Sequence, residues 1–147
     1  MSDTRSLLVS QFTRDTQALR DALVGVTHSH LSDPTFGERL TLRERLSLIA
    51  AHYYRLGEAI AYRTGQQPDS PLPEDMLWRQ EAIADRDGWQ LVALLEDLEE
   101  AWQFYYALLL DIPANDLEWH VQHVVGALSR PAFEASREIN TWRLRYQ

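Results

Sequence analysis

The sequence predicts an all-α protein, a four-helix bundle formed by a single domain over residues 1–147. Apolar residues recur at three- and four-residue steps in four separate segments, and such a stripe is typical of an amphipathic helix. Turn signals rich in proline and glycine separate these segments. No segment reads as a strand. Four amphipathic helices in one domain bury their stripes by packing against one another, which predicts the bundle.

The first two helices are expected on either side of a break that contains proline and glycine. The first should run from Asp3 to about Thr27. The second should follow Thr41, because the side chains of Thr41 and Glu44 can form a capping box that satisfies free backbone donors. Gly65 should end this helix in the left-handed conformation. Its apolar stripe consists of Leu42, Leu46, Ile49, Tyr53, Leu56 and Ile60.

A long crossover should connect the second helix to the third. It contains three prolines within "QQPDSPLP", followed by "EDMLWRQEAIAD", which fits a short helix or an ordered connection. The third long helix is expected to start at Asp87 as its N-cap and to end before Pro113. One buried core should contain Leu46, Ile49, Leu95, Leu98 and Trp102.

The fourth helical region should begin with Asn115 and Glu118 as a second capping pair, and Pro131 should interrupt it. A proline inside a helix removes one hydrogen bond and costs about 3 kcal/mol. In a first turn it costs little, because donors there are unpaired anyway. Two geometries follow: a kinked continuous helix, or a break after which Ser129 caps a new helical piece.

The composition excludes several kinds of chemistry and partner. There is no cysteine, and all 14 basic residues are arginine, which excludes thiolate nucleophiles, cysteine-bound zinc and a Schiff-base lysine. The net charge of −8 argues against nucleic acid and anionic membrane as partners. No apolar run reaches the roughly 18 residues of a transmembrane helix, and the N-terminus lacks a signal-peptide pattern. We therefore expect a cytoplasmic protein.

The segments "PAFEASREINTWR", "TLRERLSLIAAHYYRL" and "LPEDMLWRQEAIADRDGWQLVALLEDLEEAW" resemble the DinB-like four-helix bundles. Ile139, Trp142 and Arg143 match the end of that superfamily's last helix. Leu48, Pro131 and Ala135 stand where many members carry metal-binding histidines. The proline after "LSR" is similar to the ClbS/DfsB subgroup. The resemblance implies a metal-free protein without cofactor, and a role in stress or self-protection against a reactive, DNA-damaging metabolite.

In the leading functional hypothesis the protein binds a small organic molecule in a site at one end of the bundle, and hydrolytic detoxification of that molecule is the catalytic form of the hypothesis. The site would draw on His52, Tyr53, Trp78, His123 and Phe133. His52 is the candidate catalytic residue, because a neutral imidazole can orient or activate a water. Whether the protein is an enzyme stays open, since a lone core-edge histidine is more often structural.

Two further hypotheses belong to other classes of protein. In the first, His120 and His123 form an H-x-x-H pair on one helix face, and His52 opposite them completes a three-nitrogen metal site for a metal-dependent enzyme. In the second, the chain is a non-catalytic module that forms a homodimer through an apolar helix face left over after the core is filled.

Overall fold

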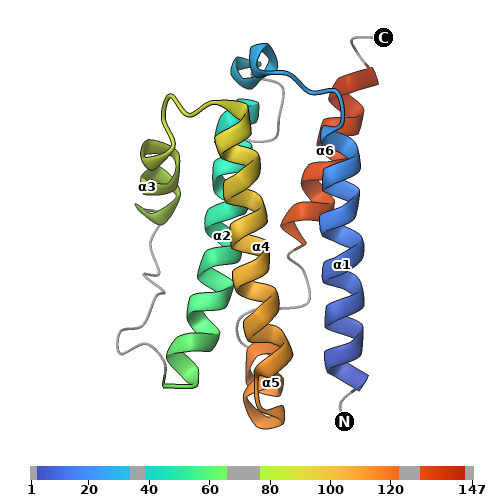
Figure 1. The fold of residues 1–147 in the computed structure, drawn as a ribbon, viewed down its shortest axis with the longest axis vertical. Coiled ribbons are helices and arrows are strands. Elements are labelled where there is room, and N and C mark those ends of the chain that lie inside the picture. Colours follow the sequence, from blue (N-terminus) through green and yellow to red (C-terminus); the bar gives the residue numbers. More distant parts are fainter. Residues whose placement is uncertain (1–2, 34–38, 66–76, 123–129, 145–147) are drawn as a thin grey trace.

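The computed structural model describes residues 3–33, 39–65, 77–122 and 130–144, and these ranges contain helices and no β-strand. The expectation of an all-α fold is therefore confirmed for the described chain (Figure 1). Within these ranges no helix combines the length and apolar character needed to cross a bilayer. The elements are α1 (Asp3–Leu23), the 3-10 helix η1 (His28–Ser32), α2 (Leu42–Arg63), α3 (Leu77–Asp85), α4 (Leu91–Asp111), α5 (Ala114–His120) and α6 (Pro131–Leu144).

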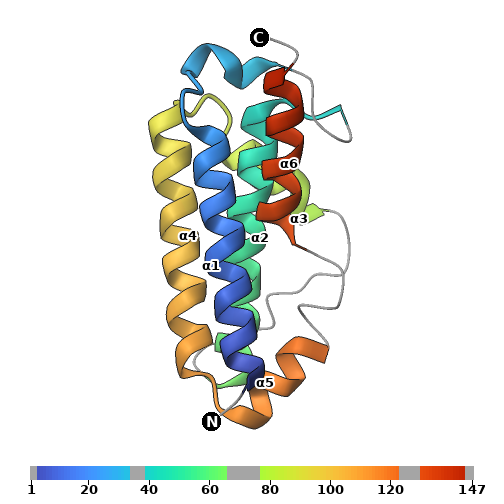
Figure 2. The same cartoon turned by 90° about the vertical axis from the view of Figure 1, so that its right-hand side faces the viewer.

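The four longest described helices, α1, α2, α4 and α6, lie alongside one another (Figures 1 and 2). α2 packs chiefly against α4, and α1 packs chiefly against α6. The shorter α3 lies against the outer side of α2, within the long connection that the sequence indicates. Residues 66–76 of that connection lie outside the described ranges.

The start and end of α2 agree with the sequence. The Thr41 side chain accepts a hydrogen bond from the Glu44 backbone N–H at 3.2 Å, and the Glu44 carboxylate accepts one from the Thr41 N–H at 2.9 Å. This is the predicted capping box. Gly65 has φ 81° just after the helix, a conformation that glycine adopts without steric cost.

Three other helix boundaries were predicted wrongly. α1 ends at Leu23 rather than near Thr27, because Gly25 takes φ 83° and turns the chain. α4 begins after Gln90 rather than Asp87, because Asp87 lies in a turn whose Gly88 has φ 77°. α5 begins at Ala114 directly after Pro113, so the following asparagine is inside the helix and not its cap.

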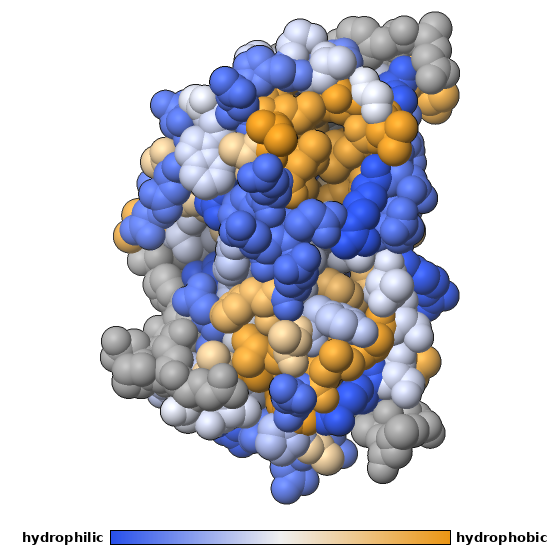
Figure 3. Space-filling model, viewed as in Figure 1, coloured by the Kyte–Doolittle hydropathy of each residue, from blue (hydrophilic) through white to orange (hydrophobic). Residues whose placement is uncertain are grey.

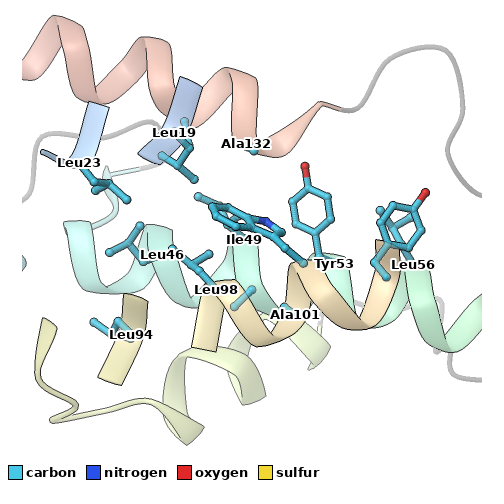
Figure 4. Packing of buried hydrophobic residues seen from close by; sticks show 14 of the residues in the cluster. Leu19, Leu23, Leu46, Ile49, Tyr53, Leu56, Leu94, Leu98, Ala101 and Ala132 are labelled. Atoms are coloured by element: carbon cyan, nitrogen blue, oxygen red, sulfur yellow. The ribbon is translucent and has the colours of Figure 1, made fainter. Parts of the chain in front are cut away.

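The core lies between the long helices, and all six predicted stripe residues of α2 are buried (Figure 4). Leu98 and Trp102 on α4 are buried with them, as expected. Leu95 is only partly buried and packs at the edge of this core, whereas Leu94 is fully buried. The residues of α4 that face inward are Leu94, Leu98, Ala101, Trp102, Tyr105 and Leu109.

Pro131 is the first residue of α6, and Arg130 before it is not helical. The Arg130 carbonyl accepts the first helical hydrogen bond, from the Glu134 N–H at 2.9 Å. Pro131 therefore occupies the first-turn position that proline tolerates best. The proposed cap Ser129 and the rest of 123–129 lie outside the described residues.

Candidate functional site

A cavity of about 290 Å³ lies between α2, the start of α3 and the first two turns of α6. Figure 2 shows the start of α3 at the height of the first turn of α6. This cavity, called the α2–α6 cavity below, brings together two of the predicted site residues, His52 and Trp78, with Pro131. Its lining consists of Leu40, Arg45, Leu48, Ile49, His52, Trp78, Arg79, Pro131, Glu134 and Glu138.

The α2 part of this wall follows from helix geometry. Arg45, Leu48, Ile49 and His52 are spaced at three- and four-residue steps, so they share one helix face. His52 is partly buried beside the rings of Tyr53 and Trp78, at centroid distances of 6.0 Å and 6.4 Å. Burial lowers the pKa of His52 to about 4, and the positive charges of Arg55 and Arg45 add to the effect. The imidazole is therefore neutral at pH 7.

Trp78 forms the α3 side of the cavity and separates it from a second hollow. The guanidinium of Arg55 lies over the indole, 4.6 Å from the ring centroid. Arg55 lines the second hollow, of about 340 Å³, but not the α2–α6 cavity, whereas Trp78 lines both. The end of α3 is fixed by the buried Ala82 and by an ion pair of Arg86 with Asp97 at 2.6 Å. α3 thus holds the indole as a wall with a hollow on each side.

The charged part of the lining was not predicted. Arg45 on α2 forms an ion pair with Glu138 on α6, with 3.1 Å between Nε and Oε2. Glu134, one turn before Glu138, lines the same cavity and is exposed to solvent. The four-residue spacing of the two glutamates on one helix face was the available signal. This spacing predicts that the two glutamates share one face of α6, but it does not predict which face of α2 lies opposite them.

Tyr53 does not line the α2–α6 cavity. It follows His52 in the chain, and consecutive residues of a helix point in different directions. Its ring points toward the start of α6, near Ala132 (Figure 4). Burial raises the pKa of Tyr53. Tyr53 thus packs beside the first turn of α6 and does not contribute to the cavity lining.

Phe133 and Arg130 complete the start of α6, away from the α2–α6 cavity. The Arg130 guanidinium lies 4.1 Å from the Phe133 ring centroid and forms an ion pair with the buried Asp15 at 2.7 Å. Phe133 is partly buried and is absent from the lining of that cavity. The remaining predicted site residue, His123, lies outside the described residues.

His120, from the alternative metal set, is fully buried in α5. Its Nε2 lies 2.9 Å from the Tyr105 hydroxyl, and its Nδ1 has no hydrogen-bond partner in the described part of the chain. Burial lowers the pKa of His120 to about 4. Among the described ranges no three histidine, aspartate or glutamate side chains are placed to hold a metal ion. The set of His52, His120 and His123 is incomplete there because His123 is not described.

The positions that the DinB resemblance assigns to metal ligands have a definite place in the structure. Leu48 and Pro131 line the α2–α6 cavity, while Ala135 is fully buried beside it on α6. Searches against protein-family models, curated proteins and solved structures found no match to this chain.

Proposed function

We propose that this protein binds a small organic molecule in the α2–α6 cavity. The observation that carries the proposal is that one cavity joins His52 from α2, Trp78 from α3 and the start of α6 at Pro131. A hollow with an aromatic wall and a few converging polar groups is the usual form of a small-molecule site. We further propose that the fold is a four-helix bundle of DinB type, similar to the ClbS/DfsB subgroup, acting in the cytoplasm in stress or self-protection.

The chemistry of His52 favours binding over hydrolysis. A neutral imidazole donates one hydrogen bond and accepts another, which suits it to orient a ligand or a water. General-base catalysis is most effective when the pKa of the base lies near the working pH, and the pKa of His52 lies near 4. Hydrolytic detoxification would require a bound substrate to raise that pKa.

Binding to the α2–α6 cavity is tested by screening a library of small polar aromatic molecules by calorimetry. Hits should lose at least about tenfold in affinity with Trp78→Leu, because stacking against the indole is removed. Trp89→Leu is the matched control, since Trp89 is a partly exposed tryptophan outside this lining. Equal loss in both variants, or hits insensitive to Trp78→Leu, would count against the proposal.

The alternative of a metal-dependent enzyme is tested by titrating the purified protein with Zn²⁺. We expect no binding tighter than roughly millimolar, weaker than about −4 kcal/mol. His120 Nε2 lies 2.9 Å from the Tyr105 hydroxyl, so a metal at that nitrogen would require breaking a buried hydrogen bond, and the other nitrogen, Nδ1, is buried within the core. A micromolar zinc site lost in His52→Ala would favour the metal-dependent enzyme instead.

A homodimer is a second candidate, favoured by an apolar hollow between α1 and α4. It holds about 290 Å³ and is lined by Leu23, Val24, Leu95, Leu98 and Trp102 with Arg20 and Glu99. Figure 3 shows apolar surface on this face, and Val24 is 67% exposed. Arg20 and Glu99 pair with each other within the chain at 2.6 Å, so a second copy related by a twofold axis would contact this hollow chiefly through its apolar residues. Sedimentation should show a dimer that Val24→Asp dissociates; a monomer at all concentrations would exclude it.

A further inference from the structure

The charges around the α2–α6 cavity are not equally available to a ligand. Arg45 and Glu138 neutralise each other across the cavity wall at 3.1 Å. Arg79 also has an interaction partner of its own. Glu134 lines the same cavity, is exposed, and forms no ion pair with any side chain of the described ranges. The nearby Arg130 instead binds Asp15 through two nitrogens, at 3.1 Å and 2.7 Å.

Like Glu134, the aromatic wall of the cavity favours a positively charged ligand. Arg55 covers the indole of Trp78 from the side of the second hollow, because Arg55 lines that hollow and not the α2–α6 cavity. The ring therefore presents the remainder of its surface to the α2–α6 cavity. The face of an indole carries negative electrostatic potential and attracts cations. His52 is uncharged at neutral pH, whereas Arg55 and Arg45 carry positive charges that disfavour a cation beside the imidazole, so the counter-charge for a cationic ligand has to come from Glu134.

We infer that the α2–α6 cavity takes a small organic cation, an aromatic ring that bears an ammoniomethyl or amidinium group, with Glu134 as counter-ion and Trp78 as stacking surface. This inference rests on the proposed function, which it narrows to one class of ligand. An aromatic carboxylate is the opposing case, and it would need Arg45 or Arg79 to give up a present partner. The net charge of −8 adds a general attraction for cations that the experiment must separate from the effect of Glu134.

Three probes of nearly the same shape distinguish a site for organic cations from a site for aromatic carboxylates: benzylamine, benzyl alcohol and benzoate. Their dissociation constants are measured at pH 7.5 and low salt from the indole signals of nitrogen-15-labelled protein. We expect benzylamine to bind about tenfold more tightly than benzyl alcohol, and benzoate to bind most weakly. In Glu134→Gln the preference for the amine should fall to about twofold or less. Because Glu134 is exposed, this variant should fold as the wild type does, which circular dichroism verifies.

Glu96→Gln is the matched control, because Glu96 is an exposed glutamate on α4 outside the lining and its replacement removes the same charge. It should keep the full preference. Equal loss in both variants would assign the selectivity to the net charge and overturn the role of Glu134. If benzyl alcohol or benzoate binds more tightly than benzylamine, and this binding is lost in Trp78→Leu, the inference is overturned but the proposed function stands. No binding of any probe up to about 10 mM would count against both.

Discussion

His120 is an ionisable side chain with none of its surface exposed, held against the Tyr105 hydroxyl. A neutral imidazole satisfies that hydrogen bond at modest cost, whereas a charged imidazole in the same place would lose its hydration. The pKa of about 4 in the folded protein, against 6.5 for an ordinary histidine, expresses this difference. The stability of the folded protein should therefore depend on pH.

The sign of that dependence follows from which state takes up the proton. Between pH 6.5 and pH 4 the unfolded chain protonates His120 and the folded protein does not, so acid favours unfolding. The contribution of His120 is fully present above pH 6.5 and is lost as pH falls toward 4. Urea unfolding should show that wild type loses roughly 2–3 kcal/mol more between pH 7 and pH 4.5 than His120→Gln. An identical loss in both proteins would mean that His120 is not buried and neutral.

The position of Pro131 relative to its helix determines how replacement by alanine changes the stability of the protein. If Pro131 lay within a continuous helix, Pro131→Ala would restore a helical hydrogen bond and stability would rise. Pro131 instead begins α6, so alanine restores no helical bond and gives the unfolded chain more freedom. We expect Pro131→Ala to cost about 0.4–1 kcal/mol in urea unfolding. A gain of 1 kcal/mol or more would indicate that a helix runs through this position.

Gly57 on α2 lies directly against the Phe104 side chain of α4. A Cβ added there would lie 2.5 Å from the Phe104 ring and 3.3 Å from the Leu108 side chain. Alanine is intrinsically better than glycine in a helix by about 1 kcal/mol, so the clash and the propensity oppose each other. Gly57→Ala should therefore be neutral or destabilising in wild type, yet stabilising by about 1 kcal/mol when Phe104 is already alanine.

Unfolding free energies of the four proteins in this cycle give the coupling between Gly57 and Phe104. We expect a coupling of about 0.5–3 kcal/mol, as for residues in direct contact. Additivity within about 0.3 kcal/mol would mean that the Phe104 ring moves away without cost and that the two helices are not closely packed there.

Across the whole molecule, the sequence correctly predicts structural features that are determined by residues close together in the chain. The Thr41–Glu44 cap and the α2 stripe were correct, because both are set within one or two helical turns. The Asp87 and Asn115 caps were wrong, because the same residue types occur in turns and within helices. Cap-forming side chains alone do not fix where a helix starts.

The limit of prediction from local sequence patterns is clearer in the candidate site. His52 and Trp78 were chosen from the sequence, and they line one cavity. The place of Glu134 there depends on how α6 is rotated against α2, which no local pattern encodes. Tyr53 points toward Ala132, which is far from it in the chain, and its position beside His52 in the sequence did not indicate this packing.

We propose that ligands bind between α2, α3 and α6. The most direct test is to follow the side-chain nitrogen signals of the labelled protein while titrating the tightest-binding molecule from the screen. We predict that the His52 imidazole and the Trp78 indole shift together with a single dissociation constant, whereas the Trp102 indole, in the α1–α4 hollow, stays unchanged. The largest shift at Trp102, with His52 and Trp78 unmoved, would contradict the claim.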